Sequence, residues 1–194
     1  MYYGGLADKA DTSASLRLFF ALWPPPEACR RLTELASSVA AAAGARPVHP
    51  ADLHLTLAFI GALPAALLPL ACAAGAAQDT AGALLSLDRI ERWGEAAVLG
   101  CGQAAAPESL RWLADGLAAA LRVRGLPVDA RRFRPHVTLC RGGAQSLPAG
   151  SLATPIDWRM ESFVLAQSSA GRTAPRYRIL REWPLQRPVP GGRR

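Results

Sequence analysis

The sequence lacks the features of several common protein classes. No stretch approaches the 18 uncharged apolar residues that a membrane-spanning helix needs. Asp8, Lys9 and Asp11 occupy the positions where a signal peptide has its apolar core, so we expect no export. Walker A, GxGxxG and HExxH motifs are also missing, and with them the classes of site that they mark. These absences indicate a cytoplasmic globular protein without membrane association.

Cysteine and lysine are scarce. The four cysteines form no CxxC pair and have no zinc-ligand spacing with a histidine, so we expect reduced thiols, no metal and no other cofactor. Lys9 is the only lysine, and arginine supplies nearly all of the positive charge behind the net +7. Abundant Ala, Arg, Gly and Pro resemble the codon bias of a GC-rich genome. The total charge is therefore weaker evidence for an anionic partner than its concentration in the second half of the chain.

The length and apolar content predict one folded domain. The chain has 194 residues, of which 51% are hydrophobic and 19% charged, and this composition is globular. Residues 1–14 lack any hydrophobic period and are expected to form a flexible arm. The domain then covers 15–185, and a basic tail over 186–194 is expected to be disordered. A monomer is the default expectation.

Hydrophobic periodicity and Pro/Gly punctuation predict an α+β fold with mixed or antiparallel sheets. We expect helices over 27–43, 61–78 and 107–124. Strands are expected over 16–23, 54–60, 83–92, 96–103, 134–141, 156–167 and 177–183.

Two of the three histidines open matching tetrapeptides in strand-like segments, His54-Leu55-Thr56-Leu57 and His136-Val137-Thr138-Leu139. Because side chains alternate along a strand, His and Thr of each copy share one face. One such motif has an ordinary explanation, since threonine favours strands. The duplication instead predicts two imidazoles and two hydroxyls around one cavity.

The sequence resembles the 2H phosphoesterase superfamily, which is named for its two HxTx motifs, and within it the RNA 2',3'-cyclic phosphodiesterases (2'-5' RNA ligases). Four blocks carry the resemblance in order: RLFFALWPPPEACRRL, DLHLTLAFIG, FRPHVTLCR and APRYRILREWPL. The resemblance implies a bilobal fold, in which two pseudo-repeat lobes with small antiparallel sheets surround a central cleft and carry helices outside. It also implies His54 as proton donor and His136 as proton acceptor.

This chemistry fits the residue types. Opening a cyclic phosphate needs one group to deprotonate water and another to protonate the leaving oxygen, and imidazoles do both near neutral pH. Thr56 and Thr138 can donate hydrogen bonds to the phosphate oxygens. The expected substrate is RNA with a 2',3'-cyclic phosphate end, such as a tRNA fragment, or a cyclic nucleotide. The expected product is a 2'-phosphate, and the same site would allow the reverse 2'-5' ligation.

Four flanking residues are more ambiguous. Arg141 matches the basic residue that follows the second motif in the family and would bind phosphate. Strict alternation nevertheless places it opposite to His136, and it reaches the cleft only if the strand ends or bulges there. Phe59 has the same relation to His54; the resemblance implies stacking on a nucleobase, and core packing is the alternative. His49 and Trp93 are weaker candidates for substrate contacts.

Three alternatives stay open at this stage. The first is a 2H phosphoesterase that acts on another cyclic phosphate or on a 2'-5' linkage. The second is a non-catalytic RNA- or nucleotide-binding module on the same fold, which turnover would exclude. The third is a two-histidine metal site, which the sequence supports least because no carboxylate or cysteine lies at ligand spacing.

Overall fold

The structure is a computed structural model that describes residues 15–102, 106–142, 149–169 and 173–187. The helices are α1 (Pro26–Ala43), α2 (Leu68–Ala76) and α3 (Glu108–Val123), with short 3-10 turns at Pro50–Asp52 and Ala65–Leu67. The strands are β1 (Ser15–Leu22), β2 (Arg46–Pro47), β3 (Leu55–Pro64), β4 (Leu84–Trp93), β5 (Ala96–Gly100), β6 (His136–Arg141), β7 (Gly150–Arg159), β8 (Ser162–Ser168) and β9 (Tyr177–Pro184).

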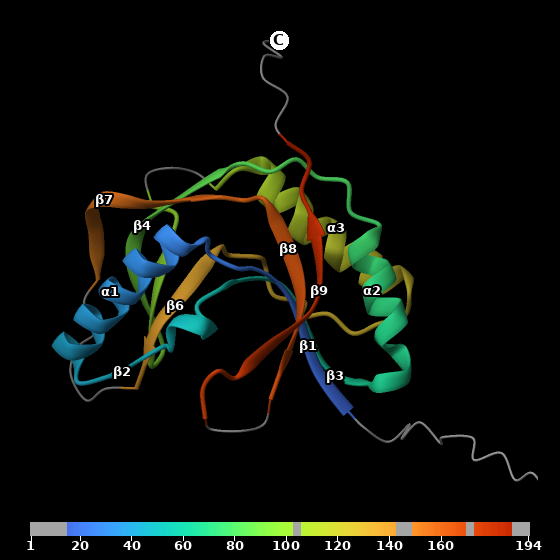
Figure 1. The fold of residues 1–194 in the computed structure, drawn as a ribbon, viewed down its shortest axis with the longest axis horizontal. Helices are drawn as coiled ribbons and strands as arrows, with labels where there is room; N and C mark the ends of the chain where they lie inside the picture. Colours follow the sequence, from blue (N-terminus) through green and yellow to red (C-terminus); the bar gives the residue numbers. More distant parts are fainter. Residues whose placement is uncertain (1–14, 103–105, 143–148, 170–172, 188–194) are drawn as a thin grey trace, which may run out of the picture.

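The strands form two antiparallel halves that meet at one point (Figure 1). One half has the order β7-β4-β5-β6, with β2 paired to β6, and the other has the order β3-β1-β8-β9. A single residue pair, Leu55 with Val137, connects β3 to β6 and so joins the halves into one path. Each half contributes one HxTx strand to this junction, which confirms the α+β, two-lobed architecture that the sequence predicts.

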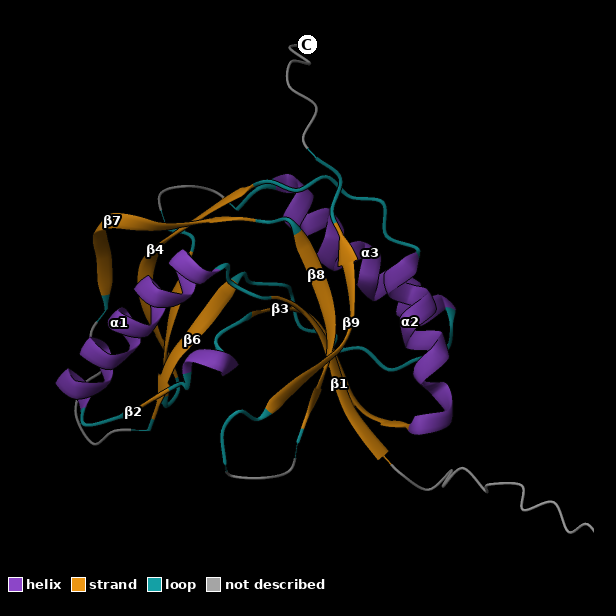
Figure 2. Ribbon diagram, in the orientation of Figure 1, coloured by secondary structure: helices purple, strands orange, loops and turns teal. Residues whose placement is uncertain are grey.

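Helices α1 and α3 each pack on the half of the sheet that does not contain the strand before them in the chain. Helix α1 follows β1 in the chain but packs on β2, β6 and β7 of the other half. Helix α3 follows β5 but packs on β3 and on α2. Figure 2 shows this arrangement, with α1 over the β6–β7 half and α2 beside α3 at the other end of the molecule. Each half is therefore packed against a helix that follows a strand of the other half in the chain.

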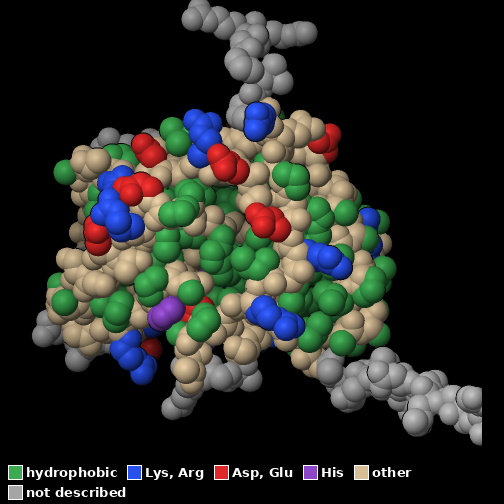
Figure 3. All heavy atoms as spheres, viewed as in Figure 1, with side chains coloured by type: hydrophobic (Ala, Val, Ile, Leu, Met, Phe, Trp, Pro, Cys, Tyr) green, Lys and Arg blue, Asp and Glu red, His purple; other side chains and the backbone are tan. Residues whose placement is uncertain are grey.

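Local sequence explains where α1 begins and ends. Pro26 occupies the first turn, where its missing N–H would have no partner in any case. Leu32 and Val39 lie on the buried face. Gly44 ends the helix at φ 60°, a left-handed conformation that glycine adopts without a steric penalty. The face of the molecule drawn in Figure 3 has apolar side chains in its middle and charged side chains around them.

Strand β1 is buried on both faces. Leu18, Phe20 and Leu22 point into the main core, whereas Phe19 and Ala21 belong to a small second cluster on the opposite face. That second cluster continues into Trp23, Phe59 and Tyr177. Strand β1 is therefore held in place by packing on both faces of the sheet.

Two predicted elements were wrong. The helix predicted over 61–78 is only α2, because β3 continues through Gly61 to Pro64 and pairs with the start of β1. Gly61 takes φ +85°, which lets the strand bend without ending. The strand predicted over 156–167 is two strands, β7 and β8, which pair with β4 and β1 respectively. No glycine or proline marks the break at Met160-Glu161.

The chain ends are only partly described. The predicted arm (1–14) and residues 188–194 of the predicted tail lie outside the described residues. Gln186, the first residue of that tail, is paired with Ala81 in an isolated bridge, and its N–H donates to the Thr80 carbonyl. Gln186 is therefore hydrogen-bonded to residues of the predicted domain. Within the described ranges, no helix is long and apolar enough to cross a membrane.

Candidate active site

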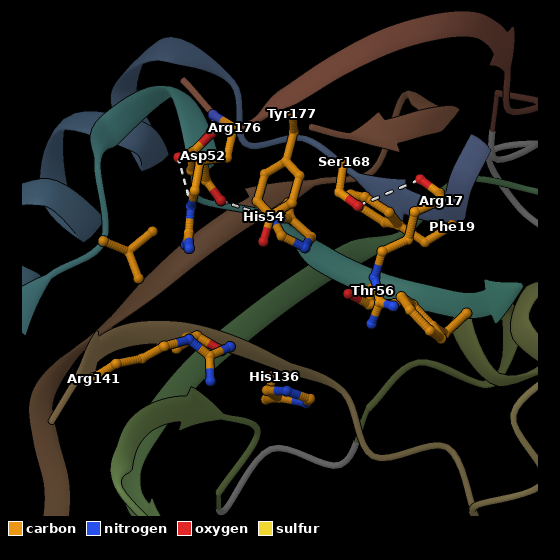
Figure 4. Close-up of a pocket in the computed structure, with 13 residues that line it drawn as sticks. Arg17, Phe19, Asp52, His54, Thr56, His136, Arg141, Ser168, Arg176 and Tyr177 are labelled. Atoms are coloured by element: carbon orange, nitrogen blue, oxygen red, sulfur yellow. Dashed lines mark hydrogen bonds and ion pairs between the residues drawn. The ribbon is translucent and has the colours of Figure 1, made fainter. Parts of the chain in front are cut away.

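The two HxTx strands line one cavity of about 270 Å³ at the junction of the halves (Figure 4). All six residues predicted for the site line it: His54, Thr56, Phe59, His136, Thr138 and Arg141. His136 and Arg141 come from β6 on one side of the cleft, and the residues of the first motif come from the other. The structure thus brings together side chains that are about 80 positions apart in the chain.

Both imidazoles are held by the same local hydrogen bond. His54 Nδ1 lies 2.7 Å from the Asp52 carbonyl oxygen, and His136 Nδ1 lies 2.7 Å from that of Arg134. A carbonyl oxygen only accepts, so each Nδ1 carries the proton. Nε2 is then the nitrogen of each ring that is left to exchange a proton with a substrate.

A matching bulge lies at the last residue of each motif. In the pairing of β6 with β5, Thr138 is opposite Val98 and Cys140 is opposite Ala97, so Leu139 is an extra residue. In the pairing of β3 with β1, Thr56 is opposite Ala21 and Ala58 is opposite Phe20, which makes Leu57 extra. Each bulge puts the alternation one residue out of step.

The bulges explain the positions of Phe59 and Arg141. Without them, both residues would point away from the histidines, whereas both line the cleft. The condition that the sequence set for Arg141, a bulge in its strand, is met. The guanidinium of Arg17 lies 4.8 Å from the ring centroid of Phe59, so one face of this aromatic is covered by a cation.

His54 lies in an aromatic box. Its ring stacks on Trp23 at a centroid distance of 5.1 Å and 14° between planes, with Phe19 at 5.0 Å and the edge of Tyr177 at 4.9 Å. This burial lowers the pKa of His54 to about 4, because the charged imidazolium loses its hydration. His54 is therefore neutral at neutral pH in the free protein.

His136 lies against a different group. The Trp93 ring packs on it with centroids 4.3 Å apart. Burial lowers the pKa of His136 as well, and the positive charges of Arg134, Arg141 and Arg131 lower it further. Trp93 itself does not line this cleft; it packs against His136 from outside.

Asp52 is a site residue that the sequence did not reveal. Its side chain is buried, accepts a 2.8 Å hydrogen bond from the backbone N–H of Arg176, and lies 3.7 Å from the guanidinium of that residue. Its own carbonyl accepts from His54. Asp52 therefore fixes the first histidine and the segment before β9 at the same time.

Other contributors come from the ends of the domain. Arg17, Phe19, Ser168, Arg176 and Tyr177 line the cleft, from β1 and from the region around β8 and β9. The signal in the sequence was the presence of arginine and aromatic residues in the opening and closing blocks. His49 does not line the cavity; its ring nitrogen accepts from the Ala51 N–H and caps the turn at Pro50–Asp52.

The arrangement suits an anion that undergoes acid–base chemistry. Three guanidiniums and one carboxylate, all from residues lining the cleft, surround two imidazoles and two threonine hydroxyls. A phosphate would find both charge-assisted and hydroxyl donors there. Among the residues that the structure describes, no three His, Cys, Asp or Glu side chains gather as a metal site.

Comparison with known proteins gives consistent matches. Residues 22–98 match the family described as LigT like Phosphoesterase. A curated RNA 2',3'-cyclic phosphodiesterase of Escherichia coli is 31% identical over 170 residues, which cover 87% of this chain and 96% of that protein. One of Thermus thermophilus, with the same name, is 30% identical, over 88% of this chain and 91% of its own.

Solved structures agree with these matches. Escherichia coli LigT complexed with 3'-AMP superposes with a TM-score of 0.79 at 29% identity, covering 89% of this chain and 99% of that one. A crystal structure titled only as a phosphoesterase gives a TM-score of 0.80 at 28% identity, with the same coverage. The fold is thus shared over almost the whole length of both structures.

Proposed function

The chain belongs to the LigT-like phosphoesterase family, and from that premise we propose that it hydrolyses the 2',3'-cyclic phosphate at the end of an RNA to a 2'-phosphate. The observation that carries this proposal is the pair of imidazoles in one cleft, each with Nδ1 fixed by the carbonyl two residues earlier. Two curated relatives bear the name of this activity.

In the proposed reaction His136 is the base and His54 the acid. Nε2 of His136 takes a proton from water as the water oxygen bonds to phosphorus. The bond from phosphorus to the 3'-oxygen breaks, and Nε2 of His54 gives its proton to that oxygen. A 5'-hydroxyl in place of water would give a 2'-5' linkage, which accounts for ligation. Solvent restores both protonation states after each turnover.

The negative charge of the substrate would favour protonation of His54, whose low pKa otherwise conflicts with a role as the acid. With a pKa of about 4, His54 carries almost no proton on Nε2 at neutral pH in the free protein. A phosphate anion beside His54 favours the imidazolium and raises this pKa. Binding of the substrate therefore promotes protonation of His54. For His136, the lowered pKa already favours the neutral form that a base needs.

The remaining groups would bind the phosphate and the nucleoside. Thr56 and Thr138 would donate to the non-bridging oxygens, where charge develops in the transition state. Arg141 would pair with the phosphate. Phe59, with Arg17 on one face, would offer its other face to the base. The four cysteines are free thiols, which suits a reducing compartment, and we place the activity in the cytoplasm.

The test is product identification. The protein is incubated with an oligoribonucleotide that ends in a 2',3'-cyclic phosphate, and phosphorus NMR distinguishes the isomers. A 2'-phosphate is expected. A 3'-phosphate would contradict the assigned bond cleavage, and tight binding without turnover would mean a binding module. The His54→Ala/His136→Ala double variant controls for contaminating nucleases.

A further inference from the structure

A second hollow of about 440 Å³ lies beside the cleft. Its walls come from β4 and β5, from the first half of α3 and from the segment 132–135 that leads into β6. The side chains that decide its character are Trp93, Arg111, Arg132, Phe133 and Arg134. It thus combines aromatic surface with guanidiniums, which is the composition of single-stranded nucleic-acid sites.

The hollow opens on the same face of the sheet as the cleft. Residues directly opposite on neighbouring strands project to the same face. Gly100 is opposite His136 and Val98 is opposite Thr138, and both β5 residues line the hollow while their β6 partners line the cleft. Residue 100 is glycine, so β5 adds no side chain of its own beside His136 at this position.

The Trp93 ring, which packs at a tilt against the His136 ring, forms the boundary between the two spaces. The guanidinium of Arg134 lies 4.2 Å from the Trp93 ring centroid and 2.8 Å from Glu91, which also accepts from the indole N–H of Trp93. Arg134 and Glu91 therefore neutralise each other in building this wall. Asp115 is the other carboxylate that lines the hollow, and Arg111 and Arg132 line it as well.

Arg111 and Arg132 are the uncommitted cations. Both side chains are exposed, and neither guanidinium makes an ion pair or hydrogen bond with another residue that the structure describes. In the cleft, by contrast, Arg17 covers Phe59 and Arg176 pairs with Asp52. An RNA chain that extends out of the cleft would therefore meet unpaired guanidiniums on the His136 side.

We propose that this hollow binds the nucleotide that precedes the terminal cyclic phosphate of an RNA strand, with Arg111 and Arg132 on its internucleotide phosphate. The inference rests on the proposed function and deepens it. It makes an oligoribonucleotide, rather than a free cyclic nucleotide, the preferred substrate class. A mononucleotide fills only the cleft, whereas an oligonucleotide also fills the hollow.

Equilibrium binding tests the proposal without requiring turnover. The ligands are a tetraribonucleotide with a 2'-phosphate end and a nucleoside 2'-phosphate, titrated by calorimetry at several salt concentrations. The test variant is Arg111→Ala/Arg132→Ala. The matched control, Arg122→Ala/Arg159→Ala, removes the same charge from exposed positions on α3 and β7 outside the hollow. Unchanged thermal unfolding of both variants confirms that they fold.

We expect the test variant to lose roughly 10-fold or more in affinity for the tetranucleotide, and the control to lose much less. The log–log salt slope should fall by about one, since one phosphate contact disappears. Affinity for the nucleoside 2'-phosphate should stay unchanged. Equal losses for both ligands, no loss, or a wild-type protein that binds neither ligand would overturn the proposal.

Turnover separates this proposal from the proposed function. If the wild-type protein binds the tetranucleotide through Arg111 and Arg132 but hydrolyses no cyclic phosphate, the hollow is a binding site and the proposed activity is refuted. A wild-type protein that hydrolyses cyclic phosphate ends, with the test variant equal to wild type on the oligonucleotide, would refute the hollow alone.

Discussion

The Asp52 carboxylate accepts a hydrogen bond from the backbone N–H of Arg176, 2.8 Å away and 124 positions further along the chain. This contact fastens the segment before β9 to the turn that precedes the first HxTx motif. The same residue holds the His54 ring through its carbonyl oxygen. Asp52 thus connects the segment before β9, through its side chain, to the proposed acid, through its backbone carbonyl.

Replacing Asp52 should destabilise the protein. Asp52→Ala leaves the Arg176 N–H without its acceptor, which should cost about 1–3 kcal/mol in the free energy of unfolding. Asp52→Asn keeps an acceptor and should cost less. Urea unfolding measures both, with Asp115→Asn, at an exposed position on α3, as control. Equal stability of wild type and Asp52→Ala would mean that this contact is not needed to close the domain.

The threonine hydroxyls should matter for rate and not for folding. Valine keeps the β-branched shape, so Thr56→Val and Thr138→Val should fold normally. Each should lower kcat roughly 10- to 1000-fold, the range for loss of one transition-state donor. Thr154→Val, on β7 outside the cleft, is the matched control and should keep full activity. Full kcat in both cleft variants would make these residues strand formers only.

The His54 imidazole should titrate abnormally. In NMR titrations of the free protein, we expect a pKa near 4, and inorganic phosphate should raise it by adding an anion to the cleft. The unfolded chain has the ordinary pKa of 6.5, so it binds the proton first. The free energy of unfolding should therefore fall as the pH drops from about 6.5 to about 4. A pKa that ignores phosphate would contradict substrate-assisted protonation.

The sequence was sufficient to predict that the two HxTx motifs share one cavity and insufficient for the surroundings of the motifs. His54, Thr56, His136 and Thr138 follow from a repeated motif whose alternation is local, so each strand fixes its own pair. Arg141 could not be placed, because a bulge shifts the alternation. The clue was present, since Leu139 and Cys140 are two consecutive apolar residues and both are fully buried.

The parts that were missed depend on long-range contacts. Asp52 and Arg176 are unremarkable in their own segments and acquire a role only when the fold brings them together. Similarly, the break between β7 and β8 is set by the different strands with which they pair, and no turn residue announces it. Pairing partners and bulges are decided by tertiary packing, which local periodicity does not report.

The central claim is that His54 is the acid and His136 the base, and a sulfur substitution tests it most directly. Either alanine variant should lose on the order of 100- to 10,000-fold in rate on the normal substrate. When sulfur replaces the bridging 3'-oxygen, the leaving thiolate needs no proton. His54→Ala should then recover much of its activity, while His136→Ala stays slow because its water is not deprotonated. Rescue of His136→Ala instead would reverse the roles, and rescue of neither variant, with RNA binding intact, would contradict the acid–base pair.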